Sequence, residues 1–260
     1  MGVDTPLYYQ ERSKFDLFIC GAKPEYEYVA SQFHYKNGEV RYTGLARFDA
    51  LHSFKTKRQV LIMPTYRKWL QDMSPEEVAR SEYVERWSHL LNHPRLAEIA
   101  EKYNVQILFY PHQLMQKFIG LFPSDNPNII IGDSYTFDVQ PLLKESALLI
   151  TDFSSVHFDF AYMEKPVLYY QFDEERMFRE HNGRASYFDY QTMSFGEKCQ
   201  SEEALLEGIA DYAAGDFQRK PEYARRVEGF FPLHDTHNCE RIYQEIVKSF
   251  DVSPSAGQKG

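Results

Sequence analysis

Two adjacent serines, Ser154 and Ser155, could hold phosphate because of the sequence on either side of them. The apolar run 147–150 has the length of a strand buried on both faces, and 156–164 is apolar nearly all round, as a buried helix would be. Hydroxyls and free backbone N–H groups at a helix start attract phosphate. The other interpretation is an ordinary serine N-cap on a structural helix, and the local pattern alone favours it, because such caps are common.

Other side chains with phosphate-binding or acid–base chemistry follow further apolar runs. Thr65 and Arg67 come just after one run, and a guanidinium is a planar fork that matches phosphate oxygens. His112 follows another run, where it could donate to a phosphate, act as an acid, or be a hydrogen-bonded structural histidine. Arg47 and Asp49 follow a glycine turn, and they could face a cleft or form a local ion pair on a surface loop.

The apolar runs that carry these groups alternate with helical segments. They begin at residues 60, 105, 129, 147 and 167. This order predicts an α/β fold with a doubly wound, mostly parallel sheet. In such a sheet, ligands bind beyond the carboxyl ends of the strands, where Arg67, His112 and Ser154 are expected. We expect three parts: 1–54, a Rossmann-like domain at 55–250, and a disordered polar tail at 251–260.

The composition excludes several classes of protein. The formal charge of −9 argues against a general nucleic-acid binder, which would need a basic surface. The three cysteines are far apart and form no metal-binding spacing, which is typical of buried thiols in a reducing cytosol. No apolar run approaches the roughly 20 residues of a membrane span, and the first residues lack a signal-peptide core. We therefore expect a soluble, cytoplasmic protein.

Taken together, the segments resemble the carboxyl-terminal half of the CDP-glycerol:poly(glycerophosphate) glycerophosphotransferases, which include teichoic-acid and capsule polymerases. The most specific match is the TDFSS and FDFA block at 151–161, which contains Thr151 and Asp152. PTYR at 64–67 is moderately specific. Five further matches are weaker. They are the segment 43–49, which contains Arg47 and Asp49; His112; Asp138 together with Leu142 and Leu143; the segment 166–173; and the segment 235–241, which contains Asp235, Asn238 and Arg241. The match extends over roughly residues 15–245.

The resemblance implies a GT-B fold, of which this chain supplies the Rossmann-like half that binds CDP-glycerol or a similar CDP-polyol. It implies that Thr65, Arg67, Thr151, Ser154 and Ser155 surround the donor diphosphate, and that His112 is catalytic. The residues that it places near the nucleotide or cleft are Arg47, Asp49, Asp138, Asp152, Asp235, Asn238 and Arg241. The implied reaction moves a polyol phosphate to a cell-surface polymer and releases CMP, without a bound metal or cofactor.

The chain also departs from the family pattern. Tyr66, Phe153, Ala46 and Thr236 stand where the family usually has Trp, Tyr, Pro and Gly. The family's HGTxxK-like segment, whose histidine is thought to be the base, is absent, which suggests an excised domain, a truncated gene, or half of a two-chain enzyme. We therefore expect the isolated chain to bind donor but to transfer slowly or not at all.

Two other functions stay open. One is a GT-B glycosyltransferase that uses a nucleotide sugar for capsular polysaccharide, because the phosphate-binding parts would be the same. The other is a non-catalytic partner subunit that keeps only the fold. For an enzyme of the family, the resemblance implies a polymer acceptor, an acceptor-side domain or chain as partner, and a peripheral position at the inner face of the plasma membrane.

Overall fold

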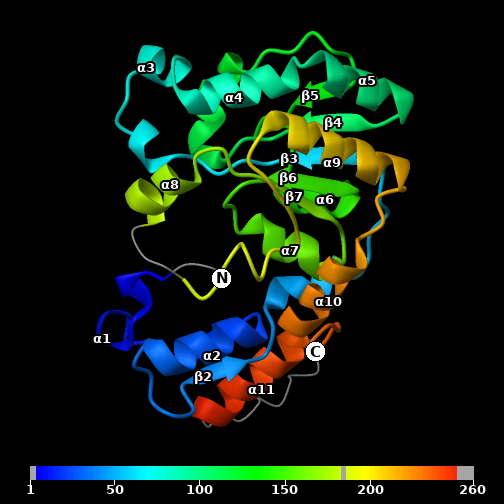
Figure 1. Cartoon of the computed structure of the whole chain (residues 1–260). Helices are drawn as coiled ribbons and strands as arrows, with labels where there is room; N and C mark the ends of the chain where they lie inside the picture. Colours follow the sequence, from blue (N-terminus) through cyan, green and yellow to red (C-terminus); the bar gives the residue numbers. More distant parts are fainter. Residues whose placement is uncertain (1–3, 183–185, 251–260) are drawn as a thin grey trace, which may run out of the picture. The chain divides into compact units, whose positions relative to one another are not determined.

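The computed structural model describes residues 4–182 and 186–250, and it divides the chain into two compact units (Figure 1). The first unit consists of Met1–Ser53, Ser186–Phe188 and Glu228–Gly260, and the second of Phe54–Ala185 and Asp189–Val227. The break after Ser53 falls beside the expected one. Residues 228–250 group with the first unit instead of with the expected 55–250 domain. The tail at 251–260, which we expect to be disordered, lies outside the described residues.

The second unit is built on a six-stranded sheet with the order β5-β4-β3-β6-β7-β8. Every neighbouring pair is parallel, which confirms the predicted doubly wound parallel sheet. The strands are β3 (Gln59–Ile62), β4 (Gln106–Phe109), β5 (Ile129–Ile131), β6 (Leu148–Thr151), β7 (Val167–Tyr170) and β8 (Gly196–Cys199). Strand β8 is not predicted from the sequence, because two of its four residues, Glu197 and Lys198, are charged.

Helices cover both faces of this sheet. Residues of α4, α5 and α9 share one core with alternate strand residues such as Val60, Ile62 and Ile150, whereas α6 and α7 pack on the strands β3, β6 and β7. The helices that lie wholly within this unit are η3 (Lys68–Leu70), α3 (Pro75–Ala79), α4 (Glu82–Leu91), α5 (Pro94–Lys102), η4 (Gln113–Leu121), α6 (Val139–Glu145), α7 (Val156–Tyr162), α8 (Glu174–Arg176), η5 (Met177–Asn182) and α9 (Glu202–Ala214). Helix α10 (Pro221–Phe230) continues past the unit boundary at Val227.

The apolar spacing from Ser74 to Leu91 is that of one continuous helix, but the structure has two helices there, α3 and α4. The start is as predicted: the Ser74 hydroxyl and the Glu77 carboxylate form a capping box at the beginning of α3. The Ser81 hydroxyl then accepts the N–H of Val84 and begins α4 anew, so the chain turns between the two helices.

The first unit holds a parallel pair of short strands, β1 (Phe18–Cys20) and β2 (Val40–Tyr42). Its small core contains Cys20, Val29, Phe33, Tyr35 and Val40. The other elements are η1 (Pro6–Tyr8), α1 (Gln10–Ser13), α2 (Lys23–Gln32), η2 (Ala46–Leu51) and α11 (Asn238–Phe250). In the two described ranges, no helix combines the length and the apolar character that a membrane crossing requires.

His157, on α7, should make the fold sensitive to acid. It is 1% exposed, its Nδ1 lies 2.8 Å from the Tyr169 hydroxyl, and burial lowers its pKa from 6.5 to about 3. Between these pH values His157 is protonated in the unfolded chain but not in the folded chain. The free energy of unfolding therefore falls as the pH drops through this range, by up to about 1.4 kcal/mol per pH unit. We expect His157→Asn to flatten this slope in urea unfolding series at pH 4–7.

The slope, rather than the absolute stability, is the measurement that decides, because the smaller side chain also leaves a cavity at every pH. The half-buried His112 and His181 also have pKa values lowered by burial, so a shallower acid slope remains in the variant. Identical slopes in the two proteins would show that His157 is not the group that titrates.

Candidate functional site

The strand order reverses between β3 and β6, and a ligand crevice is expected beyond the carboxyl ends of the strands at this reversal. The chain runs outward from β3 through β4 to β5 and then returns to β6 on the other side of β3, and open α/β sheets bind ligands at such a reversal. The residues that follow β3 include Thr65 and Arg67, and those that follow β6 include Ser154 and Ser155. The observed strand order therefore places these four residues at the switch point of the sheet.

Asp152 joins the two loops that border this crevice. Its Oδ1 accepts the backbone N–H of Thr65 at 2.9 Å and that of Phe153 at 2.6 Å. The Thr151 hydroxyl donates to the carbonyl of Met63 at 2.7 Å. Both Asp152 and Thr151 have no exposed surface. In this structure both side chains hold the two loops together, and the expected roles of Thr151 at the diphosphate and of Asp152 at the cleft stay predictions.

Arg67 is also completely buried, and its observed contacts are with the protein, so its expected contact with the diphosphate stays a prediction. Its Nε and Nη2 donate to the two carboxylate oxygens of Asp173 at 2.7 and 2.9 Å. Its Nη1 donates to the Thr65 carbonyl at 2.7 Å and lies 2.8 Å from Asp152 Oδ2. Burial lowers the pKa of Arg67, but the two carboxylates outweigh it and hold the pKa above its ordinary value. Arg67 is thus a positioning residue that ties the loops after β3, β6 and β7 together.

Ser154 and Ser155 lie in the segment between β6 and the start of α7. Ser154 is half-buried and Ser155 is exposed. The Ser155 side chain forms no cap bond with α7, so it is not the ordinary N-cap that the local pattern favours. Within the described residues, no acceptor is found for the backbone N–H of Ser154, Ser155 or Val156. Two hydroxyls and three N–H groups are therefore open to a ligand.

His112, at the end of the segment after β4, is the nearest candidate for acid–base chemistry. Its Nδ1 accepts the N–H of Leu114 at 3.2 Å, so the neutral ring carries its proton on Nε2. Burial lowers the pKa of His112, although Asp152 opposes the shift, and the ring is therefore neutral at pH 7. In this state Nε2–H can donate a hydrogen bond to a phosphate oxygen.

Tyr66 connects His112 to a second histidine that is not predicted from the sequence. The Tyr66 ring centroid lies 4.9 Å from that of His112 and 4.9 Å from that of His181. His181 belongs to η5, and its Nδ1 accepts the backbone N–H of Lys68 at 3.2 Å. Nothing in the sequence indicates this contact, because His181 sits in a segment without periodic apolar residues.

A hollow of about 360 Å³ lies beside Tyr66, between the loop after β3 and η4. Gln71, Gln113 and Lys117 contribute polar groups to its wall, and Leu70 and Phe118 contribute apolar surface. This volume lies within the range of small-molecule sites. Thr65, whose Oγ1 is buried without a partner in the described structure, and the exposed Asp138 at the start of α6 stay candidate ligand contacts.

The predicted site residues of the first unit form a network of their own. The Asp49 carboxylate accepts the N–H groups of Asn238 and Cys239 at 2.9 and 2.8 Å, and therefore caps α11. Burial raises the pKa of Asp49, but these hydrogen bonds outweigh it and lower the pKa to about 2. Arg241 donates to the Thr43 carbonyl at 2.8 Å and to Asp235 at 2.9 Å.

In this network the family motifs at 43–49 and 235–241 contact each other. Asn238 has no exposed surface, and Asp49, Asp235 and Arg241 have hydrogen-bond partners within it, so the segments 43–49 and 235–241 bind each other. Their expected position near the nucleotide stays a prediction, and their observed contacts are structural. Arg47 is exposed and lies over the Phe48 ring at 5.3 Å.

The comparison with known families agrees with these motifs. The family model for CDP-Glycerol:Poly(glycerophosphate) glycerophosphotransferase matches residues 5–248. The chain belongs to this family. The Minor teichoic acid biosynthesis protein GgaB of Bacillus subtilis is 34% identical over 244 residues, which cover 89% of this chain and 26% of that protein. A Teichoic acid poly(glycerol phosphate) polymerase of Bacillus spizizenii is 26% identical over 255 residues, which cover 92% of this chain and 60% of that protein.

Solved structures show the same fold. The Wall Teichoic Acid Polymerase TagF superposes with a TM-score of 0.67 at 20% identity, over 96% of this chain and 63% of that one. The S. aureus MnaA–UDP co-structure superposes with a TM-score of 0.50 at 14% identity, over 92% of this chain and 62% of that one. This confirms the expected Rossmann-like, GT-B type of α/β fold. The family member described here spans less than two thirds of each of these proteins.

Proposed function

We propose that this chain is the donor-binding part of a glycerophosphotransferase that moves a polyol phosphate from CDP-glycerol, or a similar CDP-polyol, to a cell-surface polymer. The observation that carries the proposal is the start of α7 at the switch point, where Ser154 and Ser155 lie and three N–H groups have no acceptor among the described residues. Family membership supplies the class of donor. A group of hydrogen-bond donors of this kind suits the oxygens of a diphosphate.

In this reaction, an acceptor hydroxyl oxygen forms a bond to the β-phosphorus of the donor. The bond from that phosphorus to the bridging oxygen breaks, and CMP leaves with the electron pair. His112 donates its Nε2–H to the diphosphate and so stabilises the charge that develops on CMP. The acceptor proton passes to a base, for which the resemblance indicates a histidine of the family's amino-terminal part. The acceptor polymer and the position at the inner face of the membrane rest on the same resemblance.

The proposal predicts that the chain alone binds CDP-glycerol. We expect Ser155→Ala, combined with Ser154→Ala, to weaken this binding by about a hundredfold or more, because two hydrogen bonds to a charged group are lost and each is worth about 1.5–3 kcal/mol. His112→Ala should weaken it by about tenfold for the same reason. Isothermal titration calorimetry with CDP-glycerol measures both effects.

Ser201→Ala is the matched control for the serine variants. The Ser201 hydroxyl accepts the N–H of Ala204 at 3.2 Å and caps α9, whereas Ser155 forms no cap bond. We expect Ser201→Ala to cost about 1 kcal/mol of stability with no loss of donor affinity. Ser155→Ala should show the reverse. If the two serine sites respond alike, the open start of α7 is not the diphosphate site.

The choice of nucleotide distinguishes the alternatives. Titrations with CDP-glycerol, CDP-ribitol, CMP and UDP-sugars are compared at equal concentrations. Preference for a CDP-polyol supports the proposal, and preference for a UDP-sugar indicates a glycosyltransferase. No binding of any of them indicates a non-catalytic partner.

A further inference from the structure

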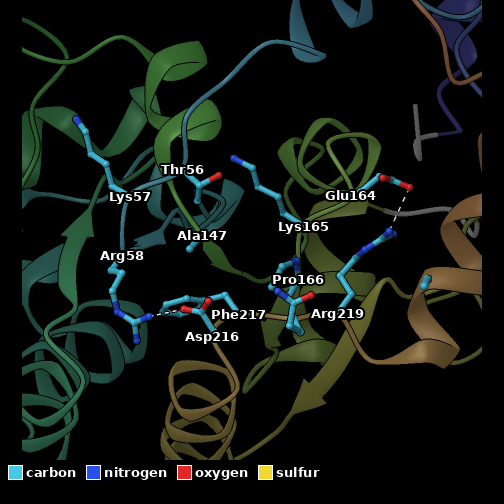
Figure 2. Close-up of a pocket in the computed structure, with 12 residues that line it drawn as sticks. Thr56, Lys57, Arg58, Ala147, Glu164, Lys165, Pro166, Asp216, Phe217 and Arg219 are labelled. Carbon is cyan, nitrogen blue, oxygen red and sulfur yellow. Dashed lines mark hydrogen bonds and ion pairs between the residues drawn. The ribbon is translucent and has the colours of Figure 1, made fainter.

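A larger hollow lies at the opposite edge of the same sheet (Figure 2). Its volume is about 570 Å³, within the range of small-molecule sites. Arg58, Ala147 and Pro166, which line it, directly precede β3, β6 and β7. The hollow therefore lies at the amino ends of three adjacent parallel strands. The donor site proposed above lies at their carboxyl ends, so the two are separate.

The wall of this hollow is positively charged. Four of its residues are cationic, namely Lys57, Arg58, Lys165 and Arg219, and two are acidic, namely Glu164 and Asp216. The chain as a whole carries a formal charge of −9. A local excess of positive charge on an acidic protein attracts anions to that place.

Two of the cations are fixed by the backbone. Arg58 donates to the carbonyls of Tyr103 and Ala213, both at 3.1 Å, and to the Asp216 carboxylate at 2.5 Å. The Lys165 ammonium donates to three backbone carbonyls around the end of α6, at 2.6–2.9 Å. These hydrogen bonds hold both side chains in place at the wall of the hollow. Arg58 stays charged and is paired with Asp216, whereas burial lowers the pKa of Lys165 to about 7, so Lys165 is only partly charged at neutral pH.

The other two cations have capacity for a ligand. Arg219 pairs through Nη2 with Glu164 at 3.1 Å, as Figure 2 shows, but its Nη1 is buried and has no hydrogen-bond partner in the described part of the chain. A buried donor without a partner is costly, and a ligand oxygen would satisfy it. Lys57 pairs with Glu145 at 2.5 Å, but both side chains are largely exposed, and such pairs contribute little.

We propose that this hollow is a phosphate-binding site, in which Arg219 and Lys57 contact the phosphate and Arg58 adds positive charge to the wall. A guanidinium nitrogen without a hydrogen-bond partner in the described residues and an exposed ammonium both suit phosphate oxygens. The ligand is a phosphate group, either a phosphodiester of a poly(polyol phosphate) or a free phosphate. The site goes beyond the donor-binding function, since none of its residues lies at the crevice between β3 and β6.

Calorimetric titration of the full chain with inorganic phosphate at constant ionic strength tests the site. We expect saturable binding, which Arg219→Gln weakens by about tenfold and Lys57→Gln by less, because the lysine contact is more exposed. Glu164→Gln should tighten binding severalfold, because it removes the carboxylate that competes for the Arg219 guanidinium. A gain of affinity cannot come from damage to the fold.

Arg95→Gln is the matched control. Arg95 is another cation of the second unit, on α5, and it pairs with Glu203 away from the hollow. We expect it to leave phosphate affinity unchanged. Because the start of α7 is itself proposed to bind phosphate, these titrations are made in the Ser154→Ala, Ser155→Ala background, so that the measured binding belongs to the hollow. The absence of saturable binding, or equal weakening by Arg219→Gln and Arg95→Gln, would overturn the proposal.

A second pair of titrations identifies the source of the phosphate. A glycerol phosphodiester dimer is compared with inorganic phosphate, and acetate serves as an anion without phosphate chemistry. Tighter binding of the diester supports a site for the polymer, and tighter binding of inorganic phosphate supports a site for free phosphate. Acetate binding as tight as either would overturn the assignment to phosphate.

Discussion

Arg67→Met is expected to lower the free energy of unfolding by about 3–5 kcal/mol, because it leaves buried charge without a partner. Asp152 and Asp173 have exposed side-chain fractions of 0% and 5%, and Arg67 faces both of them. Loss of the guanidinium would force these carboxylates to take up protons or to draw in water. Urea unfolding of the full chain, followed by circular dichroism, measures the loss.

Two further variants separate charge from shape. Arg67→Lys keeps the charge but cannot form the forked contact with Asp173, so we expect a smaller loss. Adding Asp173→Asn to Arg67→Met removes one of the two buried carboxylates that have lost their partner. The double variant should therefore recover part of the lost free energy of unfolding. If Arg67→Met is as stable as the unaltered chain, then the buried arginine does not brace the crevice.

Gly44→Ala is expected to cost about 3 kcal/mol or more, because two effects act at one position. Gly44 has a φ of +77°, which residues with a Cβ rarely adopt, and a Cβ here would overlap the side chain of Asn238. Asn238 is fully buried and hydrogen-bonded to Asp49, so it cannot move aside without breaking the cap of α11. The unfolding midpoint in urea and the helical circular dichroism signal report the change.

Gly38→Ala is the control for the backbone effect. Gly38 also has a positive φ, of +90°, but a Cβ there would meet only the end of the Arg41 side chain at 3.5 Å. We expect this variant to cost about 1 kcal/mol, the usual difference for strain alone. Equal losses at the two glycines would mean that the contact between Gly44 and Asn238 is not tightly packed.

The sheet could be predicted from the sequence because buried parallel strands are nearly continuous apolar runs. Strands β3, β4, β6 and β7 all fit this pattern, with VLI, ILF, LLI and VLYY in their centres. Strand β8 does not, since it lies at the edge of the sheet and carries a glutamate and a lysine. Edge strands need less apolar surface, and their sequences resemble loops for that reason.

The position of the candidate site was predictable, but the partners of its charged residues were not. A strand end shows where a side chain starts, and this places Arg67, His112 and Ser154 at one edge of the sheet. It does not show that Asp173, from the loop after β7, neutralises Arg67. Charged residues in a family motif can therefore support the site from within the protein, as Arg67 and Asp152 do.

The first unit shows the same limit for motifs that are far apart. Asp49 and Asn238 each resemble a cleft residue, because both are polar and follow a turn. Their hydrogen bond at 2.6 Å joins segments from the two ends of the chain, and no periodicity in the sequence indicates it. Polar pairs between segments so far apart in the sequence become visible only in the folded structure.

Because segments from both ends of the sequence build the first unit, the chain should survive a single break in its backbone. A protease cut just after Ser53 would leave the fragment 1–53 bound to residues 228–250 through the contacts of Asp49 and Thr43 with α11. The nicked protein would migrate as one species under native conditions and as two in denaturant. Removal of the segment from residue 228 onward, in contrast, would deprive Asp49 of the helix that it caps.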